Sequence, residues 1–169
     1  MLLNSTKLSF QYEALATTFE KAYAKDRTDY TAKELAKLLR TPQYRALLYF
    51  MFPILKDMRR ITKMFQFKTG SNLDIYEELK SFITTIAQRF LKQVVIQRNN
   101  IYQLMDLDVT TEFNVLKLED VNFGTTFEKE LAKFDRKTQF ELRTFGREYL
   151  RTLFMELQKK LSTLLRTLR

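Results

Sequence analysis

Residues 48–66 read LYFMFPILKDMRRITKMFQ and join an apolar first half to a basic second half. Apolar residues recur through this stretch at alternating steps of four and three, the spacing of one face of a helix. The face consists of Leu47, Met51, Ile54, Met58, Ile61 and Phe65. Thr41 can cap this helix and Pro42 suits its first position, so we predict a helix from Pro42 to about Phe67. Pro53 predicts a kink near residues 49–53.

The composition favours further helices around this one. The chain has 169 residues, enough for one domain with its own core, and we predict a single domain over residues 1–169. Only 3 Gly and 2 Pro are present, so a fold built on many tight turns is disfavoured. The sequence therefore predicts an all-α bundle of five or six helices.

Outward from the central stretch, helical patterns alternate with polar breaks. Helical spacing predicts helices over residues 4–25 and 73–98, and Thr31 with Glu34 has the form of a capping box for a short helix. Gly70 lies in the turn of residues 68–72 and suits a left-handed position. Residues 99–125 hold five acids and one base, a net charge of 1 − 5 = −4, and predict a long, mobile acidic connection. Residues 126–169 predict two helical segments or one bent helix.

The composition lacks residues that several classes of function need. There is no Cys and no His, which removes thiolate metal sites, cysteine nucleophiles and the commonest general base. The acids Asp106, Asp108, Glu119 and Asp120 lie together in a polar segment, where carboxylates are usually solvated. We therefore assign no catalytic residue, no metal site and no cofactor, and we expect that the protein is not an enzyme.

Membrane insertion is also disfavoured by the sequence. The longest nearly uninterrupted apolar run covers residues 46–55. That is about half of the roughly 20 residues that a spanning helix needs. The first ten residues lack the features of a signal peptide. We expect an intracellular protein without a membrane partner.

Two rows of bases are candidate contacts for a nucleic-acid backbone. Lys56, Arg60 and Lys63 line one side of the predicted central helix. Arg143, Arg147 and Arg151 recur at steps of four near the end of the chain. The net charge of +9 supports nonspecific attraction to polyanions. The alternatives are a solvated helix face for the first row and pairing with acids of a neighbouring segment for the second.

The end of the chain carries a second apolar stripe. Its members follow one another at alternating steps of four and three: Leu150, Phe154, Leu157, Leu161, Leu164 and Leu168. Such a stripe packs on its own domain, forms an association surface for an oligomer or a protein partner, or lies on a membrane surface. The spacing alone leaves these three readings open.

Residues 52–86, FPILKDMRRITKMFQFKTGSNLDIYEELKSFITTI, resemble a recurring block of hAT-superfamily DNA transposases and of host proteins derived from them. In that block a helix ends in an "LS-x-x-FQ"-like run, matched by residues 61–66, and an "L-D" pair follows, matched by Leu73 and Asp74. Residues 127–161 resemble the stretch before the family's "R-x-x-F-L-x-x-L" helix, with a looser match at residues 147–153. The likeness covers most of the chain through helical patterns. Family features that need Trp, Cys or His are absent.

The resemblance implies an all-helical insertion domain, which in these transposases interrupts an RNase H-like catalytic core and helps hold DNA ends and assemble oligomers. No catalytic residue is carried over, so the implied protein is a fragment or a domesticated remnant that resides in the nucleus. Our expectation is a non-catalytic helical domain that assists DNA contact or oligomer assembly. The alternative is a protein-interaction or scaffold module without a nucleic-acid role.

Overall fold

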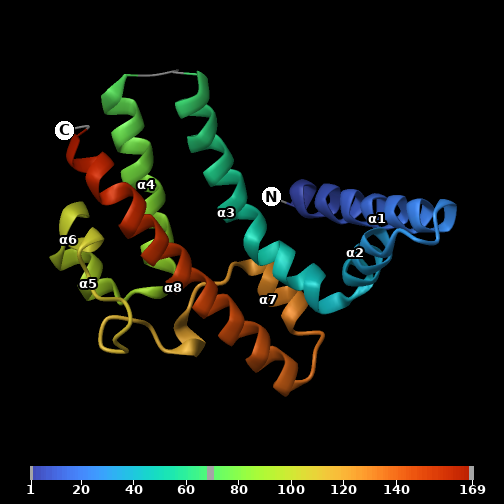
Figure 1. Cartoon of the computed structure of the whole chain (residues 1–169). Coiled ribbons are helices and arrows are strands. Elements are labelled where there is room, and N and C mark those ends of the chain that lie inside the picture. Colours follow the sequence, from blue (N-terminus) through green and yellow to red (C-terminus); the bar gives the residue numbers. More distant parts are fainter. Residues whose placement is uncertain (1, 68–70, 168–169) are drawn as a thin grey trace.

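The computed structural model describes residues 2–67 and 71–167, with side chains over residues 12–66 and 71–162. In this part of the chain the backbone forms eight α-helices, one 3-10 turn and no β-strand (Figure 1). The helices are α1 (Leu2–Lys25), α2 (Tyr30–Arg40), α3 (Pro42–Phe67), α4 (Asn72–Phe90), α5 (Gln93–Arg98), α6 (Ile101–Met105), α7 (Thr125–Leu131) and α8 (Arg136–Thr167), and the 3-10 turn η1 covers Leu118–Asp120. Five helices are longer than ten residues, which confirms the predicted all-α class.

The helices form a body and a projecting arm (Figure 1). The body contains α3, α4, α7 and α8, with α5 and α6 at one side. The arm consists of α1 and α2, which pack on each other through small buried residues such as Ala16 and Ala32. Arg40 of α2 joins the two helices of the arm, because its guanidinium pairs with Glu13 and Glu20 of α1. This hydrogen-bonded pairing lowers the pKa of the Glu20 carboxyl below its usual value.

The central helix α3 has the bounds that the sequence predicts. It runs without interruption through Pro53, and Figure 1 shows it bent where its colour passes from cyan to green. A ring without an N–H inside a helix removes one backbone hydrogen bond, which accounts for a bend there. Thr41 lies at the predicted cap position, since its carbonyl accepts from the amides of Tyr44 and Arg45. Its hydroxyl, however, donates to the carbonyl of Lys37 at the end of α2, so its side chain does not provide the predicted cap.

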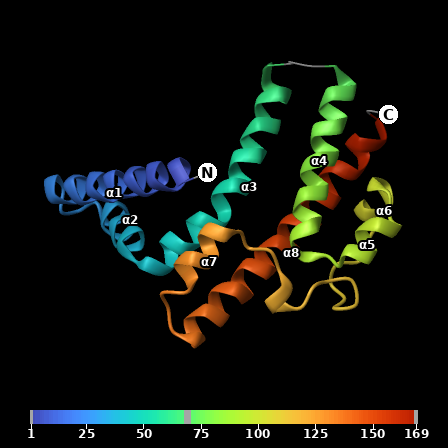
Figure 2. The same ribbon diagram turned by 180° about the vertical axis from the view of Figure 1, so that it is seen from behind.

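The core lies where α3, α4, α7 and α8 meet. Phe50 of α3 contacts the rings of Phe123, Phe127 and Tyr149 at centroid distances of 5.8–5.9 Å. A second aromatic contact in the core joins Phe90 of α4 to the fully buried Phe154 of α8, with ring centroids 5.5 Å apart. Figures 1 and 2 view the molecule from opposite sides, and both show that α8 crosses α4. Edge-to-face aromatic packing therefore joins helices that are distant in the sequence.

The helix predicted over residues 73–98 is two helices in the structure. α4 ends at Phe90, and Leu91 forms an isolated antiparallel bridge with Val115. The Leu116 amide donates to the Phe90 carbonyl at 2.7 Å, and the Lys92 amide donates to the Asn114 carbonyl at 3.0 Å. These long-range bonds hold the backbone extended and end the helix, although the apolar spacing continues past it.

The acidic connection over residues 99–125 is present, but it is not an open loop. It contains α6 and η1, and its apolar side chains enter the core: Ile101, Leu104, Met105, Val109, Val115, Val121 and Phe123 are buried. Gln158 of α8 donates to the carbonyls of Leu104 and Leu107 at 3.1 and 2.8 Å. Such packing argues against the mobility that we expected from the polar composition.

Two local signals were assigned differently by the structure. α2 begins at Tyr30, where the Asp29 carboxylate accepts from the Ala32 amide at 2.9 Å, so the capping box predicted at Thr31 is wrong. Ser71 and Asp74 form a reciprocal capping box at the start of α4. The predicted role of Gly70 lies outside the described residues. At the end of the chain, α7 and α8 confirm two separate segments.

Candidate functional site

The surface of α3 that faces solvent carries an apolar stripe of its own. Its members follow one another at steps of four and three: Tyr44, Leu48, Met51, Leu55, Met58, Thr62 and Phe65. Tyr44, Leu55 and Phe65 are 46%, 45% and 40% exposed, whereas Leu48 is half-buried and Met51 is half-buried against the core. The Thr62 hydroxyl donates to the Met58 carbonyl, so its polar group is satisfied within the helix. We call these seven residues the outer stripe.

The outer stripe lies beside the face that α3 buries. Ala46, Phe50, Ile54 and Ile61 point into the core. The single inward stripe predicted from the sequence is therefore wrong in part, because Met58 and Phe65 belong to the exposed side. Phe52, 41% exposed, widens the outer stripe. α3 is thus apolar over more of its circumference than the body covers.

The basic row predicted on α3 is divided by the fold. Lys56 and Lys63 are exposed, and so is Arg59; none of the three forms an ion pair with a described residue. Arg60 turns toward α4 instead and pairs with Glu78 at 2.9 Å. We call Lys56, Arg59 and Lys63 the basic flank, since they border the outer stripe on the side away from the core.

The arginines of the second predicted basic row are paired with carboxylates of the chain itself. Arg143 forms two hydrogen bonds with Glu128 of α7, one of them 3.0 Å long. Arg147 and Arg151 both donate to Glu112 of the acidic connection, at 3.4 and 2.9 Å. Their side chains are only 19% and 16% exposed. The alternative of pairing with a neighbouring segment is therefore the one that the structure shows.

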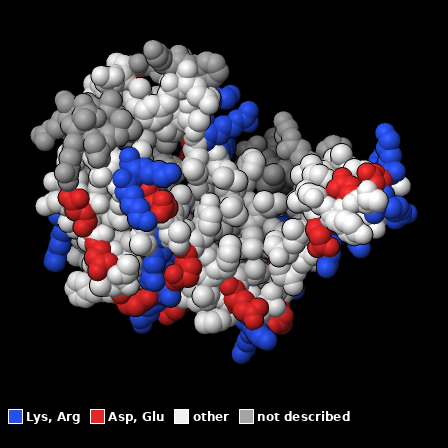
Figure 3. Space-filling model, in the orientation of Figure 1, with Lys and Arg blue, Asp and Glu red and all other residues white. Residues whose placement is uncertain are grey.

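The charge arrangement around Glu112 is a structural ion cluster. Its hydrogen bond from Arg151, and then the charge of Arg147, lower the pKa of the Glu112 carboxyl below its usual value. Figure 3 shows blue and red atoms side by side over this side of the body, rather than a continuous basic surface. Paired arginines of this kind leave few donors for a phosphate.

The proposed association stripe of the C-terminal helix is largely internal. Leu150 and Phe154 are fully buried in the core, and Leu157 and Leu161 pack partly buried against it. As an association surface, this assignment is therefore wrong for its first members, which pack on their own domain. Leu164 and Leu168 lie outside the residues whose side chains are described.

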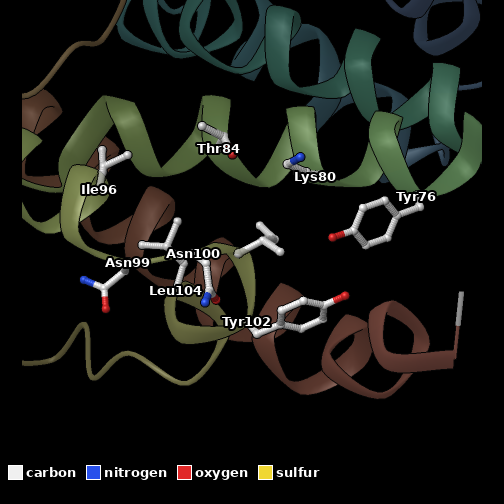
Figure 4. A pocket seen from close by; sticks show the side chains of 9 residues that line it. Tyr76, Lys80, Thr84, Ile96, Asn99, Asn100, Tyr102 and Leu104 are labelled. Atoms are coloured by element: carbon white, nitrogen blue, oxygen red, sulfur yellow. The ribbon is translucent and has the colours of Figure 1, made fainter. Parts of the chain in front are cut away.

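A cavity of about 510 Å³ lies between α4 and the α5–α6 region (Figure 4). Its lining consists of Tyr76, Lys80, Thr84, Ile96, Asn99, Asn100, Ile101, Tyr102 and Leu104. The size suits a small molecule. However, the lining has no carboxylate, and its one cation, Lys80, lies 3.4 Å from Glu77. Neither the lining nor the ion pair identifies a particular ligand for the cavity.

The acids that the sequence analysis considered do not converge. Asp108 accepts from the amide and hydroxyl of Thr110, which lowers the pKa of its carboxyl. Within the described ranges, no group of three or more Asp, Glu, His or Cys side chains is placed to hold a metal ion. The same residues include no helix long and apolar enough to cross a membrane.

The outer stripe is the feature that sequence reasoning missed. Its spacing is visible in the sequence, but Met51 and Met58 also fit the inward pattern, so periodicity alone could not separate two adjacent faces. Comparison with known proteins adds no identity: no family model, no curated protein and no solved structure matches this chain.

Proposed function

We propose that the protein is a non-catalytic helical module that binds another protein through the outer stripe of α3. The observation that carries this proposal is a row of seven residues, apolar except for Thr62, that has helical spacing over three heptads and is 40–46% exposed at Tyr44, Leu55 and Phe65. Contiguous exposed apolar surface on a folded chain is typical of interaction sites.

The rest of the fold supports the proposal, because elsewhere the chain covers a stripe of this kind. Leu150 and Phe154 have the same spacing on α8 and are fully buried. A helix partner on α3 would provide the cover that α4 and α6 give to α8. Burial of such side chains contributes about 25 cal/mol for each Å² removed from water.

Site-specific photo-crosslinking tests this function. A benzophenone amino acid at Leu55 of the full chain, in cells that express it, is expected to give discrete protein adducts. The same group at Lys137, an exposed position on α8, is the matched control. A second substitution, Phe52→Gln, should weaken the adducts from position 55. Identical adducts at both positions, or none at position 55, would contradict the proposal.

A second candidate function is auxiliary contact with DNA, and the basic flank supports it. Lys56 and Lys63 remain exposed, the net charge is +9, and the resemblance to hAT insertion domains implies a nuclear, DNA-associated role. Arg60, Arg143, Arg147 and Arg151 contribute less, because carboxylates of the chain already bind them.

Fluorescence anisotropy with a labelled duplex at two salt concentrations tests the DNA candidate. We expect binding on the order of micromolar or weaker, falling steeply with salt, as for nonspecific backbone contacts. Lys56→Gln with Lys63→Gln should reduce the salt slope by about one for each lost phosphate contact, whereas Lys137→Gln should not. Absence of binding at low salt would exclude this role.

A further inference from the structure

We infer that the partner of the outer stripe is an acidic amphipathic helix; this inference rests on the proposed function and specifies the chemistry of its partner. The stripe runs from Tyr44 to Phe65, 21 helical steps, which at 1.5 Å per residue is about 32 Å along the bent axis of α3. A partner helix of about three heptads matches that length. The alternating steps of four and three are those at which two helices interlock side chains along a common seam.

The charges beside the stripe determine which sign of charge the partner needs at its flanking positions. On the solvent side, the basic flank of Lys56, Arg59 and Lys63 follows the stripe with no carboxylate of α3 among them. The one acid of α3, Asp57, lies toward the core and 3.9 Å from Arg60. A docked helix therefore places its flanking positions against uncompensated bases. Glu or Asp at those positions is attracted, and Lys or Arg is repelled.

The same charges disfavour a second copy of this chain as the occupant. Two α3 helices packed stripe to stripe in antiparallel directions would bring two basic flanks together, whereas a parallel pair would place each basic flank beside the body of the other copy. Like charges across a helix seam are destabilising, and neither copy supplies acids to offset them. Charge repulsion thus disfavours an antiparallel pair of copies, and an acidic partner protein satisfies the basic flank better.

The proposal also differs from attachment to an anionic membrane. Both the bases and the apolar residues would be attracted to an anionic membrane surface. Stable membrane binding, however, needs a broad apolar face at the outermost surface of the molecule. Here the stripe is a seam that borders the buried residues Ile54 and Ile61 of the same helix. A seam next to a helix core is the geometry that a further helix extends.

Two synthetic peptides of 21 residues test the inference with the full chain. Both carry leucine at the seam positions; one has Glu and the other Lys at the flanking positions. In fluorescence anisotropy we expect the acidic peptide to bind at least about tenfold more tightly at low salt, with the ratio shrinking as salt rises. The variant with Arg59→Glu and Lys63→Glu should abolish or reverse the preference, whereas Lys137→Glu should leave it unchanged.

The outcomes separate this inference from the proposed function. Equal binding of both peptides, lost on Leu55→Gln, would overturn the charge selection and leave the stripe as a protein-binding surface. Binding of neither peptide would overturn the inference. The proposed function is tested independently by crosslinking at position 55. Binding to vesicles of phosphatidylcholine and phosphatidylserine that Leu55→Gln abolishes, without peptide binding, would identify a membrane surface instead.

Discussion

α3 and α8 are the two longest helices of the protein, and they use the same sequence patterns to different ends. Both carry apolar residues at steps of four and three, and both carry a row of bases. On α8 Leu150 and Phe154 of the apolar row are fully buried, and the arginines are paired with Glu112 and Glu128. On α3 the outer stripe is exposed and the basic flank has no ion pair with a described residue.

The contrast shows that neighbours, rather than the pattern on the helix itself, decide what a stripe or a basic row does. α8 crosses the middle of the body, so α4, α6 and the acidic connection cover it. α3 meets α2, α4, α7 and α8 along parts of its length (Figures 1 and 2), and Tyr44, Leu55, Met58 and Phe65 remain exposed. An apolar pattern that forms the core on one helix is exposed on the other.

A large expected difference between the two helices comes from truncating an aromatic side chain on each. Phe154→Ala removes a fully buried ring that contacts Phe90, and we expect a loss of about 3–5 kcal/mol in the free energy of unfolding. Phe65→Ala, the same change on the outer stripe, should cost less than about 1 kcal/mol because the ring is already 40% exposed. Urea unfolding of both variants measures the difference. Equal losses would mean that the outer stripe is part of the core.

The sequence predicted α3 well because its signals are local. Pro42 at the first helical position and the regular apolar spacing define its bounds without reference to other segments. The end of α4 was missed because its cause is distant: Leu91 is held extended by Val115, while the helical spacing continues through Val94. Local spacing and composition carry no information about such a partner.

The candidate site was predicted less well for the same reason. The partner of Arg147 and Arg151 is Glu112, which lies 35 and 39 residues earlier in the chain. Whether a base is free to bind phosphate therefore depends on a long-range contact. The outer stripe also has a visible spacing, but its exposure follows from which helices fail to cover it.

Gly146 tests how tightly α8 is packed, with a smaller effect. A methyl group at this position would lie 2.8 Å from a ring carbon of the buried Phe123. We expect Gly146→Ala to destabilise the protein by about 1–2 kcal/mol, since overpacking exceeds the gain in helix propensity of up to about 1 kcal/mol. Thermal unfolding measures it. A more stable variant would show that the Phe123 ring has room to move.

The ion cluster on α8 predicts a still smaller, pH-dependent effect. Glu112→Gln should cost at most about 1 kcal/mol at neutral pH, because the carboxylate is exposed although its arginine partners are not. The pKa of Glu112 is lowered in the folded protein, so its contribution is present above the unfolded value of about 4.3. The contribution is lost as the pH falls from there through the folded value.

Unfolding measured between about pH 7 and pH 3 checks this prediction. The wild-type protein and the Glu112→Gln variant should converge in stability at the acid end. Glu141→Gln is the matched control, since Glu141 has only an exposed contact of 4.0 Å with Lys137. A difference that persists unchanged at low pH would show that Glu112 stabilises the fold through something other than its charge.

The smallest expected effect on stability is also the most informative for function. Leu55→Gln replaces a side chain that is 45% exposed with another good helix former, so the free energy of unfolding should change by no more than about 0.5 kcal/mol. Circular dichroism and urea unfolding would show this. The same substitution on α8, Leu150→Gln, buries an amide in a dry core and should unfold the domain. If Leu55→Gln leaves stability unchanged while it weakens crosslinking or peptide binding, the outer stripe serves the proposed partner rather than the fold.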